Sequence, residues 1–257
     1  MTSTRFPLGA LSLALVSLIA CGGTRNFPAP TLGNMGGVYS GKDAAGRLHY
    51  AVIKAGDGTF SWLATDRSLV YGTFDLNGSM VEGQAFAFAP GAPNVQGAPN
   101  RLTLGGGASA GAISLTATDG AGAAMSAAFN LEPDSNGTTA LKDLAGTYTA
   151  SAQDASNGTG ATVHIGEDGT LSGGDSALGS LTGTVAQPVA GTNGFNVAFT
   201  FTPYDAADGS AMTFSGVAFR LKGAKTGLAL MTQSGVSQFS GIFAPVADPT
   251  AARTGAE

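Results

Sequence analysis

Two short turn sequences give the plan of this chain: Gly56-Asp57-Gly58-Thr59-Phe60-Ser61 in the first half and Glu167-Asp168-Gly169-Thr170-Leu171-Ser172 in the second. Each of them places an Asp-Gly pair between two apolar runs. Asp tolerates a positive φ and Gly adopts it freely, so such a pair suits the tight turn between two antiparallel strands. The sequence therefore predicts β-hairpins at two matching places.

These turns belong to a longer internal repeat. Three further matches keep the same order along the chain: Gly37-Val38-Tyr39-Ser40 with Gly146-Thr147-Tyr148-Thr149, Gly72-Thr73-Phe74 with Gly183-Thr184-Val185, and Phe86-Ala87-Phe88 with Phe199-Thr200-Phe201. The four offsets are 109, 111, 111 and 113 residues. A repeat of this period predicts two related domains, residues 35–133 and 141–246. We expect a polar linker between them (134–140) and a disordered tail after them (247–257).

The apolar residues alternate as half-buried strands require. In the second domain Val197, Phe199 and Phe201 share one face, and Ala198 and Thr200 share the other. The same reading gives eight strands with short connections, near residues 147–151, 162–166, 170–174, 181–187, 195–203, 213–221, 228–232 and 239–243. Short connections favour antiparallel neighbours. We therefore predict an all-β chain with two tandem up-and-down barrels of about eight strands each. A β-sandwich is the alternative, because it shows the same alternation.

The composition limits the classes of function. Of 257 residues 40 are Gly, 43% are hydrophobic and only 11% are charged, with a formal net charge of −5. An acidic chain with so few charges is a poor candidate for binding nucleic acid or an anionic lipid surface. The glycines fall between apolar runs, which indicates turns and bulges of a folded β-protein.

One part of the second domain resembles a known barrel family. The order Gly146-Thr147-Tyr148, then residues 168–173 (DGTLSG) and 181–184 (LTGT), resembles the opening strands of avidin-type barrels. Similar glycine-rich meanders occur in barrels of bacterial surface lipoproteins. The resemblance implies a barrel topology. It implies no biotin site, because avidin-like barrels line that site with several Trp residues and this domain has none.

The amino terminus has the parts of a secretory leader. Arg5 supplies positive charge, residues 8–19 form a short apolar run, and Ala20 is a small residue before Cys21. The run is shorter than the roughly 20 residues that a spanning helix needs. An uncleaved membrane anchor is the alternative. We predict a signal peptide over residues 1–20.

Cys21 is the single cysteine of the chain, and the stretch Leu18-Ile19-Ala20-Cys21 resembles the lipobox of bacterial lipoproteins. The resemblance implies cleavage before Cys21, a thioether-linked diacylglycerol on its sulfur and an acyl chain such as palmitate on its amine. Two or more chains hold a protein stably to a membrane. Gly22 stands where Asp would resemble the inner-membrane retention signal, which favours the outer membrane. Residues 21–34 are predicted to be a flexible tether.

Candidate chemistry is sparse. His49 and His164 are not equivalent in the repeat, and no further ligands stand at metal-binding spacing, so we predict no metal or cofactor site. Residues 107–111 (GASAG) match the Gly-x-Ser-x-Gly pattern of a nucleophile elbow around Ser109. That motif requires a strand-to-helix turn, and no helix signal follows here. A serine hydrolase using Ser109 with one of the two histidines is therefore the less favoured alternative.

The aromatic rings bear on ligand binding. Seven rings in the second domain are enough to fill a small barrel: Phe195, Phe199, Phe201, Phe214, Phe219, Phe239 and Phe243. The first domain has fewer rings, so a cavity is expected there if anywhere. In residues 85–89 the alanines are predicted to lie on the outer face, opposite Phe86 and Phe88. Small apolar side chains on that face would pack against the other domain or a partner protein.

The sequence thus predicts a non-enzymatic protein of the bacterial cell envelope, anchored by lipid at Cys21 and acting by binding or scaffolding. Its expected partners are the membrane, through the anchor, and either another protein or a small apolar ligand. The carrier alternative places that ligand in a cavity inside a barrel. No partner made of nucleic acid is expected.

Overall fold

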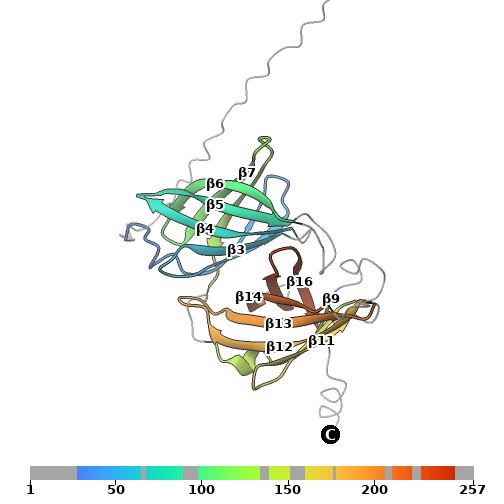
Figure 1. The fold of residues 1–257 in the computed structure, drawn as a ribbon. Helices are drawn as coiled ribbons and strands as arrows, with labels where there is room; N and C mark the ends of the chain where they lie inside the picture. Colours follow the sequence, from blue (N-terminus) through green and yellow to red (C-terminus); the bar gives the residue numbers. More distant parts are fainter. Residues whose placement is uncertain are drawn as a thin grey trace, which may run out of the picture.

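The computed structural model describes residues 28–64, 68–88, 98–133, 139–150, 160–175, 178–205, 210–221 and 227–246. The predicted leader, the predicted lipidation site at Cys21, most of the predicted linker and the predicted tail lie outside the described residues. Figure 1 shows the part that is described as two β-rich bodies, one formed by each half of the chain.

The described residues form sixteen strands and one short helical turn. The first half contains eight strands: β1 (Gly37–Lys42), β2 (Leu48–Ile53), β3 (Thr59–Ala64), β4 (Leu69–Asn77), β5 (Met80–Phe88), β6 (Asn100–Ser109), β7 (Ala112–Asp119) and β8 (Ala124–Leu131). The 3₁₀ turn η1 (Leu141–Leu144) precedes the second set: β9 (Gly146–Ala150), β10 (Thr162–Ile165), β11 (Thr170–Asp175), β12 (Gly179–Pro188), β13 (Phe195–Pro203), β14 (Met212–Leu221), β15 (Gly227–Gln233) and β16 (Gln238–Pro245). These strands match those predicted for the second half, whereas η1 was not predicted.

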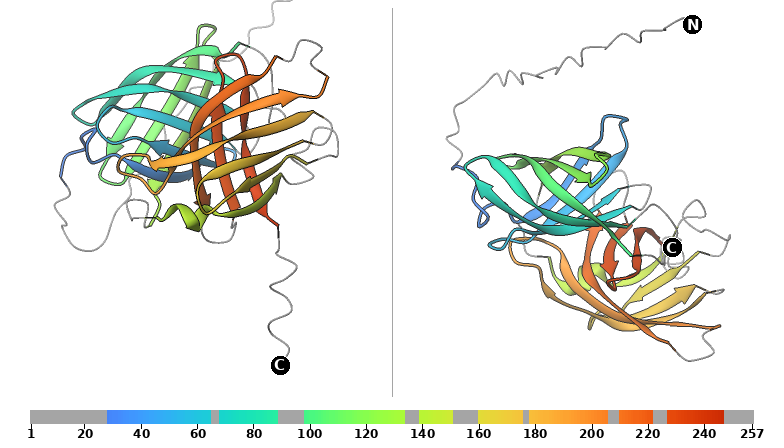
Figure 2. Two further views of the ribbon diagram at one scale, coloured as in Figure 1. Left: turned by 60° about the horizontal axis from the view of Figure 1, so that its bottom comes forward. Right: turned by 45° about the horizontal axis from the view of Figure 1, so that its top comes forward.

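Each half closes into a barrel. Every strand pairs antiparallel with the next one in the chain, and the last strand of each half returns to the first. In the first barrel Tyr39 of β1 lies opposite Leu131 of β8. In the second barrel Ala150 of β9 lies opposite Phe243 of β16. The prediction of two tandem up-and-down barrels is therefore confirmed, and the sandwich alternative is not formed. Figures 1 and 2 show the two barrels packed side by side.

The two Asp-Gly turns are hairpin connections, as predicted. Asp57 Oδ1 accepts the backbone N–H of Thr59 at 3.0 Å, between β2 and β3. Asp168 Oδ1 accepts the N–H of Thr170 at 2.9 Å at the matching place between β10 and β11. A short side chain that binds the backbone two residues ahead stabilises a turn. The hydrogen bonds from the backbone and hydroxyl of Thr170 also lower the pKa of Asp168.

The glycines of these turns are required by close packing. Gly58 has a φ of +66° and Gly169 a φ of +84°. A Cβ on Gly58 would overlap the carbonyl oxygen of Phe74, and a Cβ on Gly169 would overlap that of Val185. Both glycines therefore meet two demands that only glycine satisfies, a left-handed backbone and a close backbone approach. Their equivalence supports the internal repeat.

A buried tyrosine closes one end of each barrel in the same way. Tyr39 donates its hydroxyl to the carbonyl oxygen of Met35 at 2.8 Å. Tyr148 donates to the carbonyl oxygen of Leu144, the last residue of η1, also at 2.8 Å. Burial raises the pKa of Tyr39 to about 12. Each bond ties the segment before the first strand to the barrel, four residues away in sequence.

Aromatic rings fill both barrel interiors. The first interior holds Phe60, Trp62, Phe74 and Phe129. The second holds six of the seven rings that were expected there: Phe195, Phe199, Phe201, Phe214, Phe239 and Phe243. The seventh, Phe219, is an exception. It points outward from β14 and is buried between the barrels.

Strand β5 faces the opposite way to the prediction. Ala85 and Ala87 point into the first barrel, and Phe88 points out into the contact with the second barrel. The cause is a one-residue shift of the repeat. Ala85 lies opposite Gly72, and Phe199 lies opposite the equivalent Gly183. The Phe-x-Phe match is thus one residue out of register, and such a slip moves every side chain to the other face.

Candidate functional site

A groove with a volume of about 740 Å³ lies between the barrels. Its walls are the outer faces of β2–β5 in the first barrel and of β12–β15 in the second. Pockets of roughly 300–1,000 Å³ at domain boundaries are typical sites for small ligands. The groove therefore has the size and the position of a binding site.

A buried apolar cluster beside this groove holds the two barrels together. Leu63, Leu69 and Phe88 of the first barrel pack with Phe219 and Met231 of the second in one buried cluster. All five side chains are at most 2% exposed. Because packing of this kind resists rearrangement, it fixes the width of the groove.

The backbone adds a direct link between the barrels. The N–H of Ala55, just after β2, donates to the carbonyl oxygen of Ala190 at 3.0 Å. Gly191 follows with a φ of +73°, and a Cβ there would press against the side chain of Ala55. Glycine at this position lets the backbone segments around Ala55 and Gly191 approach closely. The link lies at the end of the first barrel where the Asp57 turn also stands.

A row of three stacked rings runs along the first-barrel wall of the groove. Tyr71 of β4 lies between Phe86 and Phe88 of β5, with centroid distances of 5.7 Å and 5.9 Å and interplanar angles of 28° and 18°. Phe88 is buried against the second barrel, whereas Phe86 is 37% exposed and lines the groove with Tyr71. The row thus begins in the interface and ends in the open groove. It offers an aromatic surface to a ligand.

The groove is almost free of charge. Among the described residues that line it, Lys54 alone is charged, and its Nζ pairs with Asp57 Oδ2 at 2.6 Å. The ion pair lowers the pKa of Asp57. The other polar groups are hydroxyls and amides, among them Ser215, Asn196 and Gln233. Such a lining suits an uncharged molecule with both apolar and hydrogen-bonding parts.

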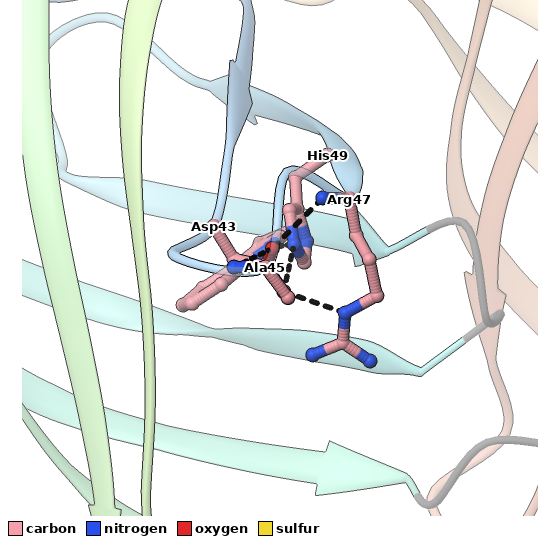
Figure 3. Close-up of polar contacts among 5 residues, drawn as sticks. Asp43, Ala45, Arg47 and His49 are labelled. Carbon is pink, nitrogen blue, oxygen red and sulfur yellow. Dashed lines mark hydrogen bonds and ion pairs between the residues drawn. The ribbon is translucent and has the colours of Figure 1, made fainter.

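A polar cluster connects the interior of the first barrel to the hairpin between β1 and β2. His49 of β2 is fully buried, and its Nδ1 accepts the indole N–H of Trp62 at 3.0 Å. Its Nε2 lies 3.4 Å from Asp43 Oδ2, and Arg47 Nε lies 2.6 Å from the same oxygen. Figure 3 shows Asp43 between Arg47 and His49. The cluster links a surface hairpin to the barrel core.

The contacts within this cluster stabilise the charged form of Asp43. Desolvation acts to raise the pKa of Asp43, but the hydrogen bonds from the backbone and guanidinium of Arg47, together with the nearby His49, outweigh it and lower the pKa to about 2. None of its members lines the groove between the barrels. Among the described residues, no group of three or more His, Cys, Asp or Glu side chains could hold a metal ion.

The residues considered for hydrolase chemistry do not come together. Ser109 ends β6 and is followed by a turn into β7, so the strand-to-helix elbow is not formed. His164 lies in the second barrel, where its Nδ1 is 3.0 Å from Thr147 Oγ1. His49 is enclosed in the first barrel with Trp62. No hydrogen bond joins Ser109 to either histidine in the described part of the chain.

The sequence analysis did not find the groove, although a signal for it existed. The groove and the buried cluster beside it are built from outward-facing side chains, which belong to strands apolar on both faces. Residues 50–53 (YAVI) and 228–231 (LALM) are such runs, and each is buried on both sides. A strand buried on both faces of a closed barrel must have a second body packed against it. The unbroken apolar runs therefore marked the interface.

Comparisons with protein-family models, with curated proteins and with solved structures found no match for this chain. No helix in the described ranges is long and apolar enough to cross a membrane.

Proposed function

We propose that this chain is a lipid-tethered, non-enzymatic binding protein of the bacterial cell envelope, and that its ligand occupies the groove between the barrels. The observation that carries the proposal is the groove itself, about 740 Å³ in volume and walled by both domains. The barrel interiors are packed with aromatic side chains. The ligand that the carrier alternative places inside a barrel is therefore proposed to bind between the barrels instead.

The lining supports a particular class of ligand. Phe86 and Tyr71 present aromatic surface, Ala198 and Val217 add apolar surface from the opposite barrel, and Gln233 supplies an amide. A charged ligand would leave its hydration shell without gaining a free opposite charge, because Lys54 is paired with Asp57. The favoured ligand is therefore a small, uncharged molecule that is apolar over much of its surface.

The groove can be tested with the neutral apolar dye Nile red and the full-length purified protein. Ala198 is exposed on β13 and lines the groove, so Ala198→Trp fills it without disturbing a core. Ala128 is exposed on β8 outside the groove, so Ala128→Trp is the matched control. We expect saturable dye binding that Ala198→Trp weakens at least tenfold and Ala128→Trp leaves unchanged. Equal dye binding by the wild-type protein and Ala198→Trp would exclude the groove.

Native mass spectrometry of the same proteins extends the test to the natural ligand. A bound small molecule should be retained by the wild-type protein and by Ala128→Trp, and lost from Ala198→Trp. If the wild-type protein instead retains a second polypeptide, the groove serves a protein partner and the small-ligand proposal is wrong.

The anchor is tested separately through Cys21. The lipobox-like stretch before it supports lipidation, which two or more acyl chains would make stable. Cys21→Ser should move the protein from the membrane fraction to the soluble fraction of the producing cells. Continued membrane fractionation of this variant, or unmodified full-length wild-type protein in the soluble fraction, would argue against the anchor. Neither result would bear on the groove.

A further inference from the structure

The groove between the barrels is lined by short side chains on both of its walls. Ser61 of β3 lines it from the first barrel, and Ala198 of β13 and Ser215 of β14 line it from the second. Ala198 and Ser215 lie directly opposite each other on their two strands. Because these side chains are short, the outer faces of the two barrels do not fill the space between them.

Tyr71 forms one side of a slot on the first-barrel wall. Both rings that stack on it, Phe86 and Phe88, belong to β5. On the other side of Tyr71 is β3, where Ser61 is the residue directly opposite. Tyr71 and Ser61 both line the groove. A serine side chain is too short to cover a phenol ring, so the face of Tyr71 that is turned towards β3 is open to the groove.

The slot has the width of one flat ring. Val52 of β2 lies directly opposite Ser61 and bounds the slot on its far side. Because neighbouring strands lie about 4.8 Å apart, Tyr71 and Val52 are separated by roughly 10 Å across Ser61. A flat ring needs about 3.5–4 Å on each face for van der Waals contact. A ring above Ser61 would therefore touch both walls and extend the row of stacked rings by one member.

Two side-chain amides of the groove offer hydrogen-bond donors. Gln84 of β5 accepts a hydrogen bond from Arg101 Nη2 with its Oε1 at 2.7 Å, and Gln233 of β15 accepts one from the N–H of Gly235 with its Oε1 at 2.6 Å. Both glutamines line the groove, one from each barrel. Their NH₂ groups make no hydrogen bond with a described residue. An amide NH₂ group can only donate, so each is suited to a carbonyl oxygen of a ligand.

We propose that the groove binds a flat, uncharged ring compound that carries carbonyl oxygens. The ring lies above Ser61 and stacks on Tyr71. The carbonyl oxygens accept hydrogen bonds from the amide groups of Gln84 and Gln233. This inference rests on the proposed function, because it names the class of ligand for the same groove.

The lining separates this class from other neutral ligands. A saturated chain or a bent ring would fill space but would not stack on the open face of Tyr71. A flat hydrocarbon would stack, but it would remove water from the two amide NH₂ groups without offering an acceptor. A sugar presents hydroxyl donors, whereas the Oε1 atoms of Gln84 and Gln233 already accept hydrogen bonds from Arg101 and Gly235. A flat carbonyl compound uses both the ring face and the two donors.

Equilibrium dialysis of the full-length protein against three uncharged probes tests the proposal. The first probe is 2,3-dimethyl-1,4-naphthoquinone, which is flat and has two carbonyl oxygens. Decahydronaphthalene-1,4-dione keeps the oxygens but is not flat, and 2,3-dimethylnaphthalene is flat but has no oxygen. We expect saturable binding of the quinone, at least about threefold tighter than that of the saturated dione, because only the quinone stacks on Tyr71. This comparison needs no variant protein, so it does not depend on the folding of a mutant.

Substitutions locate the two kinds of contact. In the double variant Gln84→Leu with Gln233→Leu, the preference for the quinone over 2,3-dimethylnaphthalene should fall about tenfold, because two hydrogen bonds are lost. In Tyr71→Leu, the preference for the quinone over the saturated dione should fall at least about threefold. Asn130→Leu and Tyr204→Leu are the matched controls. They remove an amide and a ring from exposed positions outside the groove and should leave both preferences unchanged.

The proposal is overturned if the quinone fails to bind a protein that binds Nile red, or if the saturated dione binds as tightly as the quinone. It is also overturned if the double variant keeps the wild-type preference for the quinone over the hydrocarbon. In each of these cases, Nile red binding that Ala198→Trp weakens would still support the groove as the site of another neutral ligand. Failure of the groove itself has a different sign, which is Nile red binding that Ala198→Trp leaves unchanged.

Discussion

Trp62 donates its indole N–H to Nδ1 of His49 across 3.0 Å, and both residues are fully buried in the first barrel. Because the indole N–H can only donate, Nδ1 must be the unprotonated nitrogen of the imidazole. The ring proton is therefore on Nε2, which faces Asp43 Oδ2 at 3.4 Å. One side-chain pair thus fixes a histidine tautomer and, through it, the contact between the core and the Asp43 hairpin.

Removing the indole donor should destabilise the barrel through this bond. Trp62→Phe leaves Nδ1 of His49 buried without a partner, which costs about 1–3 kcal/mol besides the loss of ring volume. In His49→Phe with Trp62→Phe, no unsatisfied nitrogen remains between the two positions. Urea unfolding of the four proteins of this cycle should therefore give a coupling of at least about 1 kcal/mol. Additive effects of the two substitutions would show that the bond contributes nothing to stability.

The carboxylate of Asp43 should make the free energy of unfolding depend on pH at acidic pH. Its pKa is lowered from 3.8 to about 2, so its contribution to folding is complete above about pH 4 and is lost as the pH falls towards 2. Asp43→Asn should thus be less stable than the wild-type protein at pH 7, and the difference should shrink between pH 4 and 2. Urea unfolding over this range measures the difference. A constant difference at every pH would contradict the assignment.

The two tyrosines that close the barrels should behave alike. Tyr39→Phe and Tyr148→Phe each remove a donor from a carbonyl oxygen, with an expected cost of about 1–3 kcal/mol in unfolding free energy. Tyr71→Phe is the matched control, because its hydroxyl makes no hydrogen bond with described residues, and it should stay within about 0.5 kcal/mol. A large difference between Tyr39→Phe and Tyr148→Phe would show that the two ends are not equivalent.

Alkaline pH should reduce the contribution of Tyr39 to the free energy of unfolding. Burial raises its pKa from 10 to about 12, so the fold favours the neutral phenol. The stabilisation is complete below pH 10 and is lost as the pH rises from 10 to 12. The stability gap between wild-type protein and Tyr39→Phe should therefore narrow above pH 10. Unfolding measured at pH 8 and at pH 11 checks this, and an unchanged gap would count against the raised pKa.

The glycines of the repeated turns should tolerate no side chain. Gly58→Ala and Gly169→Ala combine a left-handed backbone with an overlap on a neighbouring carbonyl oxygen, so a loss of about 2–5 kcal/mol is expected. Gly78 has a similar φ of +61° but open space around it, and Gly78→Ala should cost only about 1–2 kcal/mol. Thermal unfolding of the three variants ranks them. Equal losses would mean that backbone conformation alone matters.

The strand positions and the repeat could be predicted because they depend on local patterns. Asp-Gly turns and two-residue alternation mark where each strand begins and ends. Barrel closure could not be separated from a sandwich, because the pairing of β1 with β8 joins residues about ninety apart and leaves no local sign. The facing of β5 was missed because both of its faces are apolar. With phenylalanines and alanines alternating, only the partner strands decide which set lies inside.

The apolar runs at residues 50–53 and 228–231 indicate that a second body packs on the barrels, but they do not say which residues line the groove. Tyr71 and Phe86 come from one barrel, Val217 and Gln233 from the other, and nothing near them in sequence indicates that they share a groove. His49 was predicted to belong to no metal or cofactor site, and the structure places it inside the first barrel, where it accepts a hydrogen bond from Trp62.

Barrel closure has a consequence for how copies of this protein behave when crowded. All sixteen described strands have a hydrogen-bonded neighbour on both sides, so no free backbone edge is offered along either sheet. Exposed edges are the usual template on which chains join into aggregates. Dense populations of this protein should therefore remain dispersed, and recognition between molecules must proceed through side chains rather than through shared strands.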